Sequence, residues 1–142
     1  MRDFVLDASI LIQHVVTDVH TANVDALFEV IGSEINAHIP EFCLIECVNV
    51  IWKQVRFNNV PASDAMEHVE NLQALNLTMI PPGGLLPRAL EIGLKHQLPI
   101  YDAIYIATAE LLQYPLITDD QKQAAAAVAE GISLVPITQF EA

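Results

Sequence analysis

The chain has 142 residues and a formal net charge of −12 at pH 7, with 18 acidic residues against six Lys and Arg. This balance weighs against a general nucleic-acid-binding protein, because phosphate contacts need clustered cations. Hydrophobic residues make up 53% of the chain, yet no apolar run reaches the roughly 20 residues of a membrane helix. We therefore expect one domain over residues 1–142, in a cytoplasmic protein with no membrane partner.

Short apolar segments alternate with longer segments of helical periodicity. Strands are expected at 3–7, 37–39, 77–80, 115–118 and 133–137, and helices at 20–35, 41–57, 62–75, 85–97, 101–113 and 120–130. The strands are apolar throughout, which is typical of a parallel sheet covered by helices on both faces. The fold class is therefore α/β, and a ligand is expected beyond the carboxyl ends of the strands.

The first strand ends in the sequence FVLDAS, at Asp7. One interpretation is that Asp7 or Ser9 caps the short helix that follows and satisfies its free amide groups. The other is that Asp7 belongs to a site at the end of the strand.

The expected helix 41–57 is apolar around more than half of its circumference. What remains is a narrow polar stripe of Glu46, Asn49, Lys53 and Arg56. One interpretation is that this stripe is simply exposed to solvent. The other is that it lines a cleft, in which Glu46 and Asn49 face a ligand and Lys53 and Arg56 contact phosphates.

Cys43 and Cys47 lie four residues apart on one side of that helix. We expect them to pack as small apolar groups, not as a disulfide or a redox pair. No second Cys pair and no His pair stands at the spacing of a zinc site.

Asp102 is the only charge in the first two turns of the buried-looking helix 101–113. A carboxylate that enters a core must be capped, paired or bound to a metal. The sequence TDDQ after the fourth strand has the form of a capping box, with Thr118 as N-cap and Gln121 at the third helical position. Asp119 and Asp120 then lie in the first turn, where negative charge is favourable.

These acids share one possible meeting point, the edge where the parallel strands end. Gathered carboxylates repel and raise each other's pKa, and a hard divalent cation such as Mg²⁺ or Mn²⁺ removes that cost. Such a site binds phosphate oxygens and activates water. A phosphatase with Asp7 as covalent nucleophile is a rival, but Ser9 stands where the second acid of its D-x-D pattern is needed.

Four segments in order resemble the PIN-domain family, and above all its VapC-type toxin ribonucleases: FVLDASILI, IPEFCLIECVNVIWK, LPRALEIGLKHQLPIYDAIYIATAELL and PLITDDQKQAAAAVAEGISLVPI. The resemblance covers nearly the whole chain. It implies a three-layer α/β/α domain whose five parallel strands have the order 3-2-1-4-5. It also implies Mg²⁺- or Mn²⁺-dependent hydrolysis of RNA phosphodiester bonds, which leaves 5′-phosphate and 3′-hydroxyl ends.

Position by position, the family's catalytic and metal-binding acids fall on Asp7, Glu46, Asp102 and Asp120. Ser9, Asn49 and Thr118 match supporting polar positions, while Asp119 is interpreted as a surface acid. RNA contact is assigned to Lys53 and Arg56, with Arg2, Lys122 and bound metal as the remaining cations. The resemblance also implies a homodimer and a cognate antitoxin. The alternative from another class is a catalytically silent PIN-fold binding module.

Overall fold

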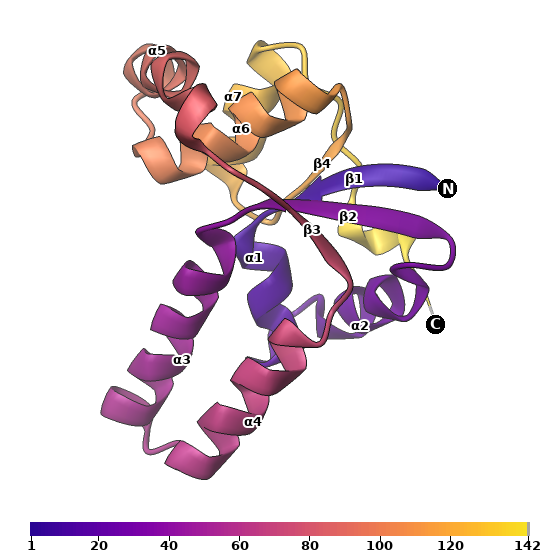
Figure 1. Ribbon diagram of the computed structural model, residues 1–142, viewed down its shortest axis with the longest axis vertical. Coiled ribbons are helices and arrows are strands. Elements are labelled where there is room, and N and C mark those ends of the chain that lie inside the picture. The colour runs from indigo at the N-terminus through magenta and orange to yellow at the C-terminus, as the bar shows by residue number, and fades with distance from the viewer. Residues whose placement is uncertain (142) are drawn as a thin grey trace.

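A computed structural model describes residues 1–141, built around a parallel sheet (Figure 1). Its strands are β1 (Arg2–Leu6), β2 (Ile35–Pro40), β3 (Leu77–Ile80) and β4 (Leu116–Ile117), in the order β3-β2-β1-β4. β1 lies between β2 and β4, and helices on both faces of the sheet bury its apolar side chains. The predicted parallel α/β class and the order of these strands are confirmed.

Helices cover both faces of the sheet in a three-layer arrangement (Figure 1). One side carries α1 (Ala8–Leu11), α2 (Thr21–Val30), α3 (Cys43–Asn58) and α4 (Ala62–Gln73), and the other α5 (Leu86–His96), α6 (Ile100–Leu112) and α7 (Gln121–Ala129). Three short 3₁₀ helices complete the fold: η1 (Ile12–His14), η2 (Gly83–Leu85) and η3 (Ile137–Gln139).

The predicted fifth strand at 133–137 is wrong, and the sheet of the described residues has four strands. Only Leu134 forms a parallel bridge, with Leu116 of β4. The backbone amide of Val135 still donates to the carbonyl of Leu116 at 3.1 Å. Pro136 follows, and because proline has no N–H the ladder stops there.

The helix expected at 20–35 ends early, at Val30. Gly32 takes a φ of 89°, a left-handed conformation that a side chain disfavours, and this turn leads the chain into β2. The other expected helices begin and end within a few residues of their predicted bounds.

Both cysteines are free and buried in the core, as predicted. The rest of α3 differs from the wide apolar face expected, because Ile45, Val48 and Trp52 are exposed. In residues 1–141, no helix has the length and apolar character that a membrane crossing requires.

Candidate functional site

The register of the central strands brings two chain segments together at the carboxyl edge of the sheet. Leu6 of β1 pairs with Ile117 of β4, so the next residues, Asp7 and Thr118, lie side by side. The hydroxyl of Thr118 donates a hydrogen bond to Oδ2 of Asp7. This predicted pair therefore meets across 111 residues of sequence.

Asp7 is buried, with only 3% of its surface exposed. Its Oδ1 accepts from the hydroxyl of Ser9 at 2.6 Å and from the amide of Ile10 at 3.3 Å, so it is the N-cap of α1. Burial nevertheless raises the pKa of Asp7 to about 7, with a further contribution from the charge of Asp120. Capping is thus confirmed, and it leaves a carboxyl group that is costly to ionise.

The predicted capping box at TDDQ is wrong. α7 begins at Gln121, and its N-cap is Asp120, whose Oδ1 accepts from the amide of Gln123 at 3.0 Å. Thr118 is held by Asp7 instead and accepts from the amide of Asp120 at 3.0 Å. Within the described residues, no hydrogen bond occupies the other carboxylate oxygen of Asp120.

Glu46 and Asp102 approach the same place from α3 and α6. Burial raises the pKa of Glu46, and the charge of Asp102 adds to the shift. Burial likewise raises the pKa of Asp102, with a contribution from Asp120. Charge repulsion thus links Asp7 with Asp120, Asp120 with Asp102 and Asp102 with Glu46, so each of the four predicted acids lies near the next.

No cation balances these acids in residues 1–141: none of the four forms an ion pair with Lys, Arg or His. An all-oxygen, half-buried and uncompensated donor set fits Mg²⁺ or Mn²⁺. The described residues hold no ready cluster of three or more metal-ligating side chains. An ion held by fewer protein ligands would keep several of its waters, as Mg²⁺ usually does.

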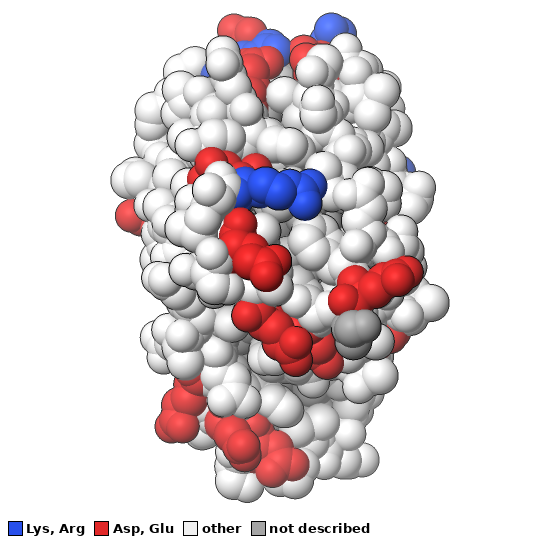
Figure 2. Space-filling model, turned by 90° about the vertical axis from the view of Figure 1, so that its right-hand side faces the viewer, with Lys and Arg blue, Asp and Glu red and all other residues white. Residues whose placement is uncertain are grey.

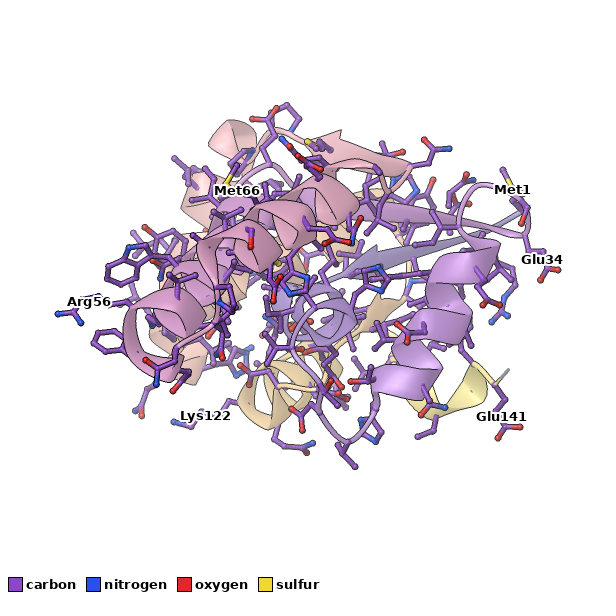
Figure 3. The ribbon with its side chains drawn as sticks, turned by 90° about the horizontal axis from the view of Figure 1, so that it is seen from below. Met1, Glu34, Arg56, Met66, Lys122 and Glu141 are labelled. Carbon is purple, nitrogen blue, oxygen red and sulfur yellow. The ribbon has the colours of Figure 1, made fainter. Side chains whose placement is uncertain are left out.

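The predicted polar stripe of α3 is only partly in this site. Asn49, Lys53 and Arg56 are exposed, and in the described part of the chain they form no side-chain hydrogen bond or ion pair. Arg56 lies over the ring of Phe57 and points outward (Figure 3). Of the four stripe residues, only Glu46 joins the acids.

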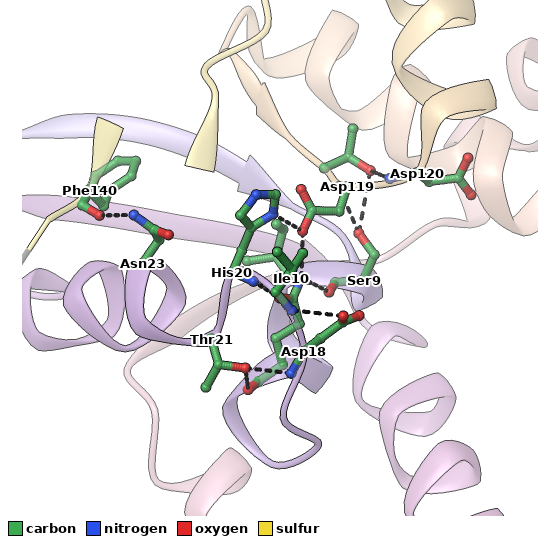
Figure 4. A network of polar contacts seen from close by, with 12 residues as sticks. Ser9, Ile10, Asp18, His20, Thr21, Asn23, Asp119, Asp120 and Phe140 are labelled. Carbon is green, nitrogen blue, oxygen red and sulfur yellow. Dashed lines mark hydrogen bonds and ion pairs between the residues drawn. The ribbon is translucent and has the colours of Figure 1, made fainter. Parts of the chain in front are cut away.

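Asp119 is not the free surface acid that was expected. Its Oδ2 accepts from Nε2 of Gln13 at 2.5 Å and lies 2.9 Å from Nδ1 of His20 (Figure 4). The buried Gln13 also donates to the carbonyl of Ser9. The loop after β4 is therefore tied to η1 and to the start of α2. The sequence feature that could have predicted this contact is Gln13, a single amide within the apolar segment ASILIQHVV.

Two further polar residues were missed. The hydroxyl of Tyr105, buried in α6, donates to Oε1 of Glu46 at 2.6 Å. The buried side chain of Gln123 donates to the carbonyl of Asp102 at 3.3 Å. Both link elements that carry the acids. Nothing in the sequence predicted this role for Tyr105, because it lies in an apolar helix and its hydrogen-bond partner belongs to a different helix.

The fold and the acids define an α/β domain with a carboxylate site at the ends of its parallel strands. The family model of the PIN domain matches residues 4–129, and the chain belongs to that family. No curated protein matches the chain.

Solved structures share this fold at low sequence identity. PAE2754 from Pyrobaculum aerophilum superposes with a TM-score of 0.74 at 21% identity, over 97% of this chain and 91% of that one. VapBC2 from Rickettsia felis, bound to a DNA fragment from its promoter, gives 0.67 at 13% identity, over 94% and 98%. VapC20 from Mycobacterium tuberculosis, a toxin that cleaves the sarcin-ricin loop, gives 0.66 at 14% identity, over 87% and 94%.

Proposed function

We propose that this protein is a Mg²⁺- or Mn²⁺-dependent endoribonuclease that leaves 5′-phosphate and 3′-hydroxyl ends. The observation that carries the proposal is the group of four electrostatically coupled carboxylates, without a cationic partner in residues 1–141, at the carboxyl edge of the sheet. Membership of the PIN family and a shared fold with VapC20, a sarcin-ricin-loop-cleaving toxin, support it.

In this proposal Asp7 and Asp120 hold the metal, and Glu46 and Asp102 complete its surroundings directly or through water. When held there, Mg²⁺ or Mn²⁺ would supply a water of lowered pKa and would offset charge on the scissile phosphate. Ser9 and Thr118 orient the Asp7 carboxylate through their hydrogen bonds. Since Tyr105 occupies Oε1 of Glu46, its Oε2 is left to accept the proton of the attacking water.

We further propose that the protein is a cytoplasmic toxin with a cognate antitoxin and that it forms a homodimer. Similar folds occur in a toxin–antitoxin complex from Klebsiella pneumoniae, with a TM-score of 0.57 at 20% identity, and in VapBC2. For the dimer, the support is a stripe of exposed leucines at helical spacing on α5: Leu86, Leu90 and Leu94.

Metal binding separates the enzyme from a silent PIN-fold binding module. With Mn²⁺ at about 100 times its dissociation constant, we expect the melting temperature to rise by about 5–10 °C. The Asp7→Asn protein should show little of this rise, because it lacks the central carboxylate. Differential scanning calorimetry with and without Mn²⁺ makes the measurement. An unchanged melting temperature in the wild type would support the binding module.

Replacing Tyr105 by Phe should lower the rate of RNA cleavage about 10- to 100-fold, the cost typical of losing a group that orients a metal-site residue. The loss follows because Glu46 no longer has its 2.6 Å hydrogen bond from the phenol. Tyr101→Phe is the matched control, since Tyr101 lies one turn earlier on α6 and is 62% exposed. Initial rates for both variants should differ clearly. Equal rates would show that the hydrogen bond does not matter.

A further inference from the structure

The far half of α3 carries exposed aromatic and cationic side chains, which we call the α3 cluster: Trp52, Lys53, Arg56 and Phe57. Trp52 is 54% exposed and Phe57 63% exposed, and their ring centroids lie 6.0 Å apart in an edge-to-face arrangement. The guanidinium carbon of Arg56 lies 5.1 Å from the centre of the Phe57 ring. Contiguous exposed apolar patches rimmed by polar residues often mark binding sites.

The distribution of the positively charged side chains also favours the α3 cluster as a binding site for an anion. Arg88 and Lys95 are bound in ion pairs with Glu110 and Glu130. Arg2 lies beside Met1, at the amino end of the sheet, over the ring of Phe4. In residues 1–141, the cations without an ion pair on the remaining surface are Lys53, Arg56 and Lys122.

Two of these free cations, Arg56 and Lys122, lie on one side of the molecule. Arg56 and Lys122 project from the left of Figure 3, whereas Met1, Glu34 and Glu141 lie at the right. The face in Figure 2, which is the right-hand side of Figure 1, is dominated by acidic side chains. The strands run toward the left of Figure 1, so the free cations lie on the side of the carboxylates.

The helix geometry aligns two members of the α3 cluster, Lys53 and Phe57, with Glu46. At 100° per residue, Lys53 and Phe57 lie seven and eleven positions after Glu46, within about 20° of its direction. Eleven residues of helix separate Glu46 and Phe57 by about 16 Å. That distance corresponds to a few nucleotides of an extended strand. A strand that reaches the carboxylates can therefore place a neighbouring base against Phe57.

We propose that the α3 cluster binds an unpaired RNA base, stacked on Phe57 and Trp52, while Lys53 and Arg56 hold the flanking phosphates. Only unpaired bases offer a free face for stacking, so the substrate class is single-stranded or looped RNA. The inference rests on the proposed function for its ligand, but it concerns binding and not hydrolysis. A second copy of the chain is the less favourable occupant, because a twofold contact through this cluster sets its own cations against each other.

The experiment uses Trp52, the only tryptophan of the chain, as its reporter. Tryptophan fluorescence of the Asp7→Asn protein is titrated with a 12-nucleotide oligouridine and, separately, with a blunt RNA duplex, in Mg²⁺ at low salt. We expect the single strand to quench Trp52 and to bind at least about tenfold more tightly than the duplex. Phe57→Ala in this background should weaken single-strand binding about 5- to 150-fold, the fold-change that corresponds to one lost base stack.

Leu111→Ala is the matched control, because Leu111 is an equally exposed apolar residue, 61%, on α6. It should leave the affinity within twofold. Equal binding of strand and duplex, or no effect of Phe57→Ala, would overturn the inference. A Trp52 signal that changes with protein concentration before RNA is added would overturn it as well, in favour of self-association. Single-strand binding without any cleavage by the wild type would uphold the inference while the proposed function fails.

Discussion

Replacing Asp7 by Asn is expected to abolish RNA cleavage and, at the same time, to stabilise the metal-free protein above pH 7. Loss of a metal ligand removes several kcal/mol of transition-state stabilisation, which lowers the rate about 10³-fold or more. Asparagine keeps the size of Asp7 and still accepts the bonds from Ser9 and Ile10. The fold should therefore survive the change that removes activity.

The stability effect follows from the pKa of Asp7, which burial raises from 3.8 to about 7. The folded state keeps its proton up to about pH 7, whereas the unfolded chain loses it near pH 4. The free energy of unfolding of the metal-free wild type therefore falls as pH rises through this window, by at most about 4 kcal/mol for this group. The asparagine side chain of the variant has no charge to bury, so the variant should lose this part of the pH dependence.

Thermal denaturation in EDTA at pH 4, 5, 6, 7 and 8 makes this measurement. The wild type and the Asp7→Asn protein should be similar near pH 4 and diverge between pH 4 and 7, with the variant the more stable. Asp64→Asn, at an exposed acid of α4, serves as control and should follow the wild type. Parallel curves for wild type and Asp7→Asn would contradict the buried-charge account.

Asp120→Asn should reduce the cleavage rate about 10²- to 10³-fold, whereas Asp119→Asn should cost at most about tenfold. Asp120 is coupled electrostatically to Asp7 and to Asp102, so its charge lies at the centre of the acids. Asparagine remains a good N-cap for α7. Asp119 instead serves the network with Gln13 and His20, where an amide oxygen still accepts hydrogen bonds.

Initial cleavage rates for the two variants, on one RNA at saturating Mn²⁺, test this division of roles. Circular dichroism of both proteins controls for folding. Losses of equal size would show that the two adjacent aspartates share one function.

The sequence predicts the features that depend on hydrophobic periodicity and on the order of strands and helices along the chain. Apolar strands between helices indicate a parallel sheet, and the rule that sites lie at the carboxyl ends of strands points to Asp7 and Asp120. The fifth strand fails because Leu134 pairs at one point only before Pro136 removes a donor.

Contacts between distant segments explain the other differences. The capping box at TDDQ is locally plausible, but Thr118 is held by Asp7 across the sheet, so the helix begins two residues later. The hydrogen bonds from Gln13 to Asp119 and from Tyr105 to Glu46 are also tertiary. No local pattern encodes them. Periodicity likewise places Trp52 on the apolar face of α3, whereas 54% of its surface is exposed.

The most direct test of the central claim is to incubate the purified protein with total RNA and map the ends of the fragments. The account predicts cleavage with Mg²⁺ or Mn²⁺ that leaves 5′-phosphate and 3′-hydroxyl ends. This cleavage should be absent in EDTA and absent with the Asp7→Asn protein, which also controls for contaminating nuclease. Fragments that are the same with wild type and Asp7→Asn, or that form in EDTA, would contradict it.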